Sequence, residues 1–200
     1  MPAGNGRDRP IAMPDSKPPR RHQPRNLIVR RLVQADMAAF VALVAAHQGQ
    51  GSAKGADVLT PAFVRKNFLG RRPAVLALVA ILEGAMTAYA LLMPILDTAV
   101  GAEGLCVAEI YVDANGQRKS VGRTLLAACA AEAERQGKTY LAWTSKAWDV
   151  EGHDAYRRIG AIEEPVMAHL LPLAKVPRFV AEGRTMMPAK GLRKRRPART

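Results

Sequence analysis

Residues 105–126 read LCVAEIYVDANGQRKSVGRTLL, and this stretch decides how the chain is interpreted. Its beginning is almost wholly apolar, which predicts a buried strand from Leu105 to Val112. Apolar residues at helical spacing further on predict a helix over residues 119–136, ended by Gly137. A strand followed by a short turn and a helix brings unpaired backbone amides to the end of the strand. Such a helix start suits a phosphate group.

The turn between this strand and this helix is basic and contains small residues. Its cations lie close together, and Gly122 allows a ligand to approach the backbone closely. The helix also carries an apolar stripe that needs no ligand, formed by Val121, Leu125, Cys129 and Ala133. An ordinary amphipathic helix with a basic first turn therefore stays an alternative to a pyrophosphate site.

The same turn resembles that of the GCN5-related N-acetyltransferase family. The family carries Gln/Arg-x-x-Gly-x-Gly/Ala between an apolar strand and an apolar helix. This chain has Gln117-x-x-Ser120-x-Gly122 after the strand end Ile110–Val112. Ser120 stands where the family usually has a glycine. If this position needs a positive φ, a serine is strained there, although its hydroxyl can donate to a phosphate.

A second stretch agrees with the resemblance. Where the family has Asn-x-x-Ala-x-x-Phe-Tyr-x-x-x-Gly-Phe/Ala, residues 149–161 read DVEGHDAYRRIGA. Tyr156 and the pair Gly160-Ala161 match at the right spacing, whereas the asparagine, alanine and phenylalanine positions are substituted. Two matches in the expected order are much more specific than either alone. The close resemblance covers residues 105–161.

The resemblance implies an α/β fold with a mixed, mostly antiparallel central sheet of six to seven strands flanked by about four helices. The remaining predicted strands are residues 27–32, 74–82, 86–94, 140–144 and 162–171, and the remaining helices are 36–47, 60–69 and 149–159. We expect an acyltransferase domain at residues 26–174. The acceptor pocket would come from the helices within 36–69 and from the loop at 97–104.

The resemblance also implies that the chain uses acetyl-CoA as a co-substrate and needs no metal. The pyrophosphate would lie on the backbone amides of residues 118–123, and the pantetheine arm would follow the edge of strand 108–112 like an added strand. A backbone amide near Val112 would then face the thioester oxygen. The residues expected to bind this carrier are Ile110, Tyr111, Val112, Gln117, Arg118, Lys119, Ser120, Val121, Gly122, Arg123 and Asp149.

Two side chains are candidates for the proton transfers of an N-acetyltransferase. Tyr156 stands at the family's position for the general acid that protonates the departing sulfur, with packing against Ile159 as the alternative. Glu109 is the candidate base for the acceptor ammonium, with a simple ion pair to an arginine as the alternative. Alternation along the strand places Glu109 and Tyr111 on one face unless a bulge intervenes. The expected reaction is direct acetyl transfer to a primary amine of an acceptor that the sequence does not name.

The chain has a formal net charge of +13, but this charge lies at its two ends. Residues 1–25 carry +4 and residues 175–200 carry +8, which leaves +1 for the rest. We expect disorder in the Pro/Arg-rich first segment and in the basic second one from about residue 190. Basic tails can bind nucleic acid through its phosphates. A non-catalytic acyl-CoA-binding module, or a protein that docks on nucleic acid or a ribosome, is therefore the alternative to an enzyme.

The sequence favours neither a membrane protein nor a protein stabilised by disulfides or a metal site. No segment approaches the roughly 20 consecutive apolar residues that a membrane span needs. Cys106 and Cys129 have no metal-ligand partner nearby in the sequence and are too few for a disulfide framework. We expect a cytoplasmic protein without a metal site or a membrane partner, and a homodimer stays open.

Overall fold

The computed structural model describes residues 26–49, 59–71, 73–117, 120–167, 169 and 171–186. It divides after Lys146 into two compact units, residues 1–146 and 147–200, and each is described by itself. The predicted termini at 1–25 and from about 190 lie outside the described residues, as does most of the loop between the first two helices.

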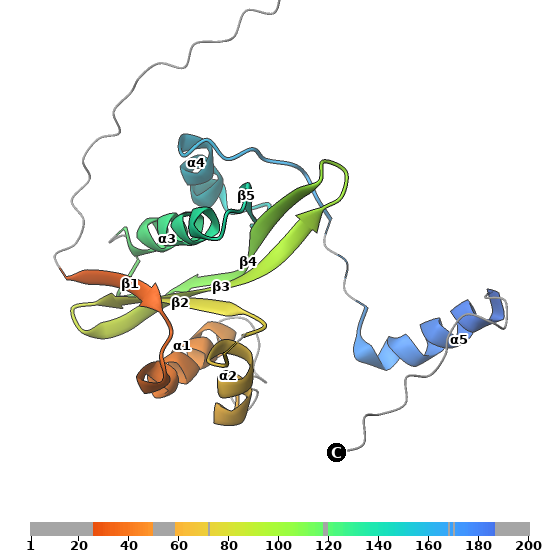
Figure 1. Ribbon diagram of the computed structural model, residues 1–200, viewed down its shortest axis with the longest axis horizontal. Coiled ribbons are helices and arrows are strands. Elements are labelled where there is room, and N and C mark those ends of the chain that lie inside the picture. The colour runs from red at the N-terminus through yellow and green to blue at the C-terminus, as the bar shows by residue number, and fades with distance from the viewer. Residues whose placement is uncertain are drawn as a thin grey trace, which may run out of the picture. The chain divides into compact units, whose positions relative to one another are not determined.

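The first unit is built on one five-stranded sheet with the strand order β1-β2-β3-β4-β5 (Figure 1). Neighbouring strands are antiparallel from β1 to β4, whereas β5 runs parallel to β4. A tight turn at Glu83-Gly84, with both residues at positive φ, joins β2 to β3, as expected for a two-residue hairpin. The strands are β1 (Leu27–Arg31), β2 (Leu76–Leu82), β3 (Ala85–Asp97), β4 (Ala102–Val112) and β5 (Tyr140–Trp143).

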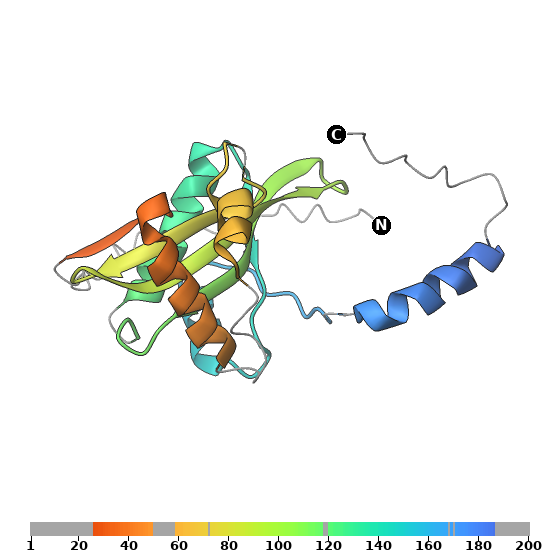
Figure 2. The same ribbon diagram turned by 90° about the horizontal axis from the view of Figure 1, so that it is seen from below.

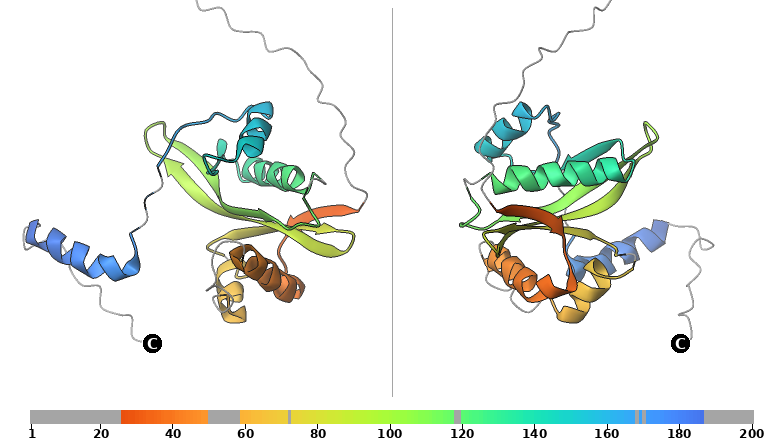
Figure 3. Two further views of the ribbon diagram at one scale, coloured as in Figure 1. Left: turned by 180° about the vertical axis from the view of Figure 1, so that it is seen from behind. Right: turned by 60° about the vertical axis from the view of Figure 1, so that its left-hand side comes forward.

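Helices cover both faces of this sheet. α3 (Val121–Arg135) lies on one face, and α1 (Met37–Gly49) and α2 (Pro61–Phe68) lie on the other (Figures 2 and 3). The stripe predicted for the helix after the turn is buried against the sheet in α3. The second core, under α1 and α2, includes Phe40 and Tyr89, both of them fully buried. The sheet is therefore buried on both faces, as its nearly continuous apolar strands require.

The hairpin between β3 and β4 is longer than the sequence suggested. Residues 97–104 were expected to form a loop, but β3 runs to Asp97 and β4 starts at Ala102. Asp97 pairs with Ala102, and Gly101 adopts a positive φ of 65° in the turn. Tyr140 of β5 packs its ring on Gly104, where an added Cβ would come within 2.5 Å of the ring. This close contact fixes the start of β5 beside β4.

The second unit contains a 3-10 turn at Leu173–Lys175 and two helices, α4 (Val150–Arg158) and α5 (Val176–Met186). Asp149 caps α4 by accepting a hydrogen bond from the Gly152 amide at 3.1 Å. The strand predicted at 162–171 is wrong, because the described residues of that segment form no strand. A strand needs a hydrogen-bonded neighbour, and Pro165 removes one donor from the segment.

The structure therefore has an α/β fold with a mixed sheet, but the predicted number of elements is not matched. The described residues hold five strands in place of six to seven, and five α-helices in place of about four. The additional helix is α5, which lies in the basic extension that had been expected to lack structure only from about residue 190.

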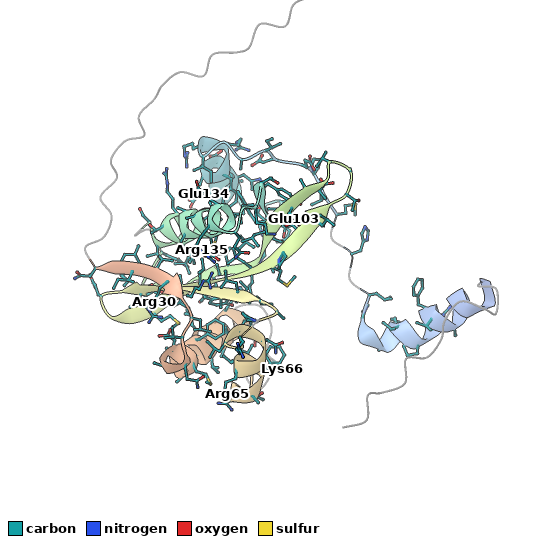
Figure 4. The ribbon with its side chains drawn as sticks, viewed as in Figure 1. Arg30, Arg65, Lys66, Glu103, Glu134 and Arg135 are labelled. Carbon is teal, nitrogen blue, oxygen red and sulfur yellow. The ribbon has the colours of Figure 1, made fainter. Side chains whose placement is uncertain are left out.

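A buried carboxylate ties α3 to the edge strand β1. Glu132 is 8% exposed and accepts hydrogen bonds from Arg135 (2.6 Å), Arg31 (2.6 Å) and Gln136 (2.6 Å). Figure 4 labels Arg135 on α3, close above β1. The Arg135 guanidinium, with help from Gln136 and Arg31, lowers the pKa of Glu132 to about 2. A depressed carboxyl pKa means that the charged form stabilises the folded state.

Replacing Glu132 by glutamine is expected to lower the free energy of unfolding at pH 7 by about 2 kcal/mol, because two guanidinium groups lose their carboxylate. The folded pKa lies below the unfolded one, so this contribution is present above about pH 5 and lost as the pH falls toward 2. Urea unfolding at several pH values measures the difference. Glu134→Gln, an exposed neighbour on the same helix (Figure 4), is the control, and equal effects of both variants would contradict the assignment.

Candidate active site

One edge of β4 has a strand partner over only part of its length. β5 pairs with β4 from Gly104 to Val107, whereas β3 pairs with β4 on the other side along nearly its whole length. Within the described part of the chain, residues 108–112 therefore have no strand on the β5 side. Unpaired N–H and C=O groups along such an edge can bind an extended ligand as if it were one more strand.

A bulge in β4 lies where this open edge begins. Leu91 pairs with Glu109 and Leu92 with Val107, so Ala108 has no partner in β3. The bulge shifts the side-chain alternation by one position. Val107 therefore packs on the α3 side, and Glu109 two positions later points to the α1 side. Tyr111 joins it there, in the core under α1 and α2.

Two glycines bring the turn and the start of α3 against the end of β4. An added Cβ on Gly116 would lie 2.8 Å from Val112 Cγ1, and one on Gly122 would lie 3.3 Å from Val112 Cγ2. Gln117 also donates a hydrogen bond from Nε2 to the Val112 carbonyl at 3.4 Å. The first amides of α3 therefore lie next to the end of the open edge. Arg118 and Lys119 lie outside the described residues, and Arg123 follows in the first turn of α3.

Ser120 precedes α3 in the left-handed conformation, with φ 61° and ψ 10°. Its side chain does not cap the helix, although its carbonyl accepts bonds from the Thr124 amide and hydroxyl, both at 3.0 Å. The position thus requires the positive φ for which glycine is suited, and serine is strained there. Among the described residues, the first helical hydrogen bond here runs from the Thr124 amide to the Ser120 carbonyl, so the amides of Val121, Gly122 and Arg123 lie at a helix start of the kind that binds anions.

Replacing Ser120 by glycine is expected to raise the free energy of unfolding by about 1 kcal/mol, since glycine adopts the left-handed conformation without a Cβ clash. Thermal or urea unfolding measures this change. Thr60→Gly is the matched control, because Thr60 caps α2 in an extended conformation and accepts a bond from the Phe63 amide at 3.1 Å. That variant is expected to be destabilised by up to about 2 kcal/mol. A destabilised Ser120→Gly protein would contradict strain at this position.

The structure surrounds Glu109 with aromatic and polar side chains. The Tyr89 hydroxyl donates a hydrogen bond to Glu109 Oε1, and His47 Nδ1 lies 3.2 Å from the same oxygen. His47 Nδ1 is also 2.8 Å from the Tyr89 hydroxyl. The His47 ring stacks on Tyr111 with a centroid distance of 4.4 Å and an interplanar angle of 14°. Among the described residues, a tyrosine and a histidine thus stand where the alternative to a base had an arginine beside Glu109.

Sequence reasoning missed His47 and Tyr89. His47 lies in the last turn of α1, and Tyr89 is the one large polar side chain among the small and apolar residues at the centre of β3. A polar residue at a buried strand position is a sequence signal, but it does not name its partner. His47 and Glu109 are 62 positions apart, so only the fold brings them together.

Tyr156 and Asp149 lie in the second unit, on and before α4. Burial, and then the Asp149 carboxylate, raise the pKa of Tyr156. The phenol therefore stays protonated at neutral pH, as a general acid must. Asp149 acts as the cap of α4 in this unit. His153 on the same helix lies 3.2 Å from Glu163. The catalytic role of Tyr156 and the carrier contact of Asp149 stay predictions.

The described residues contain no group of three or more His, Cys, Asp or Glu side chains that could hold a metal ion. None of their helices is long and apolar enough to cross a membrane.

Several of the solved structures that resemble this one are acetyltransferases. An aminoglycoside acetyltransferase from an uncultured soil metagenomic sample, in complex with sisomicin, has a TM-score of 0.62 at 20% identity over 74% of this chain and 96% of that one. A ribosomal-protein-alanine N-acetyltransferase from Brucella melitensis biovar Abortus 2308 has a TM-score of 0.58 at 18% identity, with coverage of 74% and 99%. An aminoglycoside N-acetyltransferase in complex with CoA has a TM-score of 0.54 at 13% identity, with coverage of 72% and 99%. At sequence identities of 20% or less, this structural similarity shows a shared fold alone.

The sequence itself matches the Acetyltransferase (GNAT) family over residues 43–161. This match spans more than half of the chain, and the chain therefore belongs to the GNAT family of acetyltransferases. No curated relative matches the sequence. The resemblance drawn from the turn at 117–122 and the helix at 149–161 is thus confirmed.

Proposed function

We propose that the chain transfers an acetyl group from acetyl-CoA directly to a primary amine of an acceptor. One observation carries this proposal: the open edge of β4 at 108–112 ends beside the first amides of α3. A carrier with an amide-containing arm and a pyrophosphate matches both features, because the arm can pair with the edge and the pyrophosphate can accept from the amides. Bound there, acetyl-CoA supplies the reactive thioester.

The residues at this edge have distinct tasks on the donor side. The backbone of Ile110, Tyr111 and Val112 binds the arm, and an amide near Val112 stabilises charge on the thioester oxygen. The amides of Val121, Gly122 and Arg123 hold the pyrophosphate, and the Arg123 side chain adds positive charge. Gln117, Arg118, Lys119 and Ser120 complete this carrier set as the family motif predicts.

Glu109 is the proposed base on the acceptor side. Its side chain is 39% exposed, and its Oε1 is engaged by Tyr89 and His47. Among the described residues, none is bonded to Oε2, which leaves this oxygen for an acceptor ammonium. Glu109 takes one proton from the ammonium so that the neutral amine can attack and form the C–N bond. As the C–S bond breaks, Tyr156 gives its proton to the departing sulfur and takes up the second proton that the amine nitrogen loses.

The test is a thermal-shift measurement with acetyl-CoA, followed by an assay of free thiol over a panel of amines. The similar structures suggest an aminoglycoside and a peptide with an N-terminal alanine as the first acceptors, with a lysine peptide and a small amine beside them. We expect stabilisation by acetyl-CoA and thiol release with at least one amine. An unchanged melting temperature together with no thiol release would contradict the proposal.

A carrier-binding protein without turnover is the second candidate. The left-handed Ser120 favours it, because strain at the phosphate turn can weaken the binding of the carrier. In that case acetyl-CoA stabilises the chain while no amine releases thiol. This second candidate includes a protein that docks on nucleic acid or a ribosome through its basic ends. Salt-sensitive nucleic-acid binding would support it if that binding disappears when residues 1–25 and 190–200 are deleted.

A further inference from the structure

His47 contacts the proposed base, although it lies on a different element and outside both family motifs. It lies in the last turn of α1, and its Nδ1 atom lies within reach of both Tyr89 Oη (2.8 Å) and Glu109 Oε1 (3.2 Å). Tyr89 donates to the same Glu109 oxygen. One carboxylate oxygen, one phenol and one imidazole nitrogen thus form a closed triangle on the α1 side of the sheet.

Tyr89 is suited to pass a proton within this triangle. Its ring is fully buried, with Phe40 packed edge-on at a centroid distance of 5.4 Å. Burial, and then the hydrogen bond to Glu109, raise the pKa of Tyr89 strongly, so its hydroxyl stays protonated. The phenol proton has two acceptors within reach, Glu109 Oε1 and His47 Nδ1. The hydroxyl can therefore accept from one group while it donates to the other.

His47 in turn connects the triangle with water. Its side chain is 35% exposed, whereas Tyr89 is fully buried. Among the described residues, the titratable groups that face the imidazole are Tyr89 from β3 and Glu109 and Tyr111 from β4, and α1 carries no other titratable side chain. Tyr111 stacks on the ring and fixes its orientation. The imidazole is thus held between the carboxylate and the solvent.

We propose that Tyr89 and His47 carry to solvent the proton that Glu109 takes from the acceptor. The inference rests on the proposed transferase function. The ammonium N–H bond breaks and an O–H bond forms on Glu109. The carboxyl group turns about its Cγ–Cδ bond so that the new O–H faces Tyr89, and its proton moves to Tyr89 Oη as the Tyr89 proton moves to His47 Nδ1. The imidazolium finally loses one proton to water, and proton exchange with water restores the tautomer with a bare Nδ1 before the next turnover, so one proton leaves for each amine acetylated. Both residues act through Glu109 and are positioning and relay residues.

This path matters once an acceptor is bound. An amine on Glu109 Oε2 keeps water from that side of the carboxylate, and the other oxygen is already held by Tyr89 and His47. The relay gives the proton a way out through the Oε1 side while the acceptor is bound. Without it, Glu109 loses its proton only after the product has left, and it cannot serve the next amine before then.

The test compares His47→Asn and Tyr89→Phe with the wild-type chain. Asparagine keeps a hydrogen-bonding group near the Nδ1 position but does not titrate, and phenylalanine keeps the buried ring without the hydroxyl. We expect kcat to fall roughly 10- to 100-fold in each variant. The stabilisation by acetyl-CoA should stay unchanged, and the double variant should be no slower than the slower single one, as for residues that act in one path. His169→Asn, an exposed histidine elsewhere in the chain, is the control.

Rescue by added imidazole separates a proton relay from a purely structural role. In His47→Ala, imidazole should restore much of the lost kcat in a saturable manner, and the wild-type rate should not respond. The rate of His47→Asn should also depend on pH differently from that of the wild-type chain. Variants with wild-type kcat and pH profile, or a loss that imidazole does not reverse, would overturn the relay while leaving the transferase in place. A wild-type chain that releases no thiol would instead overturn the proposed function, and the relay with it.

Discussion

Replacing Glu109 by glutamine is expected to lower kcat about 100-fold at neutral pH, the size of effect typical of a lost general base. The amine arrives as an ammonium ion, and the amide of glutamine cannot take its proton. Glutamine is nearly isosteric and can still accept from the Tyr89 hydroxyl, so the core around β3 and β4 should keep its shape. The Michaelis constant for acetyl-CoA should stay unchanged, because the carrier is bound by the backbone edge and by the helix start.

The pH dependence separates this explanation from a structural one. Raising the pH toward the pKa of the amine supplies neutral acceptor from solution, so the deficit of Glu109→Gln should shrink as the pH rises. Steady-state kinetics from pH 6 to 10 measure this. Glu103→Gln is the matched control: Glu103 lies on the same strand (Figure 4), is exposed and pairs with Lys138. A Glu109→Gln variant with the wild-type kcat and pH profile would contradict its role as the base.

Replacing Tyr156 by phenylalanine is expected to lower kcat by about 100-fold as well, because the departing sulfur loses its proton donor. The raised pKa of Tyr156 keeps its phenol protonated through neutral pH, so wild-type activity should not fall on the alkaline side below about pH 10. The loss in the variant should depend on the leaving group: an acetyl thioester whose thiol is more acidic needs less help and should show a smaller deficit.

The control for this variant is a second tyrosine that contacts no proposed ligand. Tyr140 packs its ring on Gly104 at the start of β5, so Tyr140→Phe keeps the packing and should retain wild-type kcat. Rate measurements with acetyl-CoA and one activated acetyl thioester, for both variants, complete the experiment. If Tyr156→Phe loses the same factor with both thioesters, the tyrosine supports the structure of α4 and does not act as the acid.

Local sequence patterns predicted most of the fold. The alternation of apolar segments and turns located the strands of the sheet, and Thr60-Pro61 marked the start of α2 correctly. The motif at 117–122 also placed Ser120 where the family has a glycine, so serine would be strained if the position needs a positive φ. Ser120 does adopt a positive φ. These features depend on residues near one another in the chain, and short-range geometry determines them.

Long-range pairing could not be predicted in the same way. The apolar residues at 162–171 look like a strand, yet a strand forms only beside a hydrogen-bonded neighbour, which the sequence does not specify. The bulge at Ala108 is likewise a property of the β3–β4 register. The contact of His47 with Glu109 depends on how α1 crosses the sheet, and so the second half of the candidate site became visible only in three dimensions.

Amide hydrogen exchange with and without acetyl-CoA tests the central claim most directly, since it reports on the backbone that is proposed to bind the carrier. The account predicts that acetyl-CoA slows exchange at residues 108–112 and at 121–123, where an edge and a helix start gain partners, while residues 76–80 in the middle of β2 change little. Saturable protection confined to those two segments would support the carrier site. If acetyl-CoA leaves the exchange of both segments unchanged at saturating concentration, the carrier does not bind along β4 and α3, and the account is wrong.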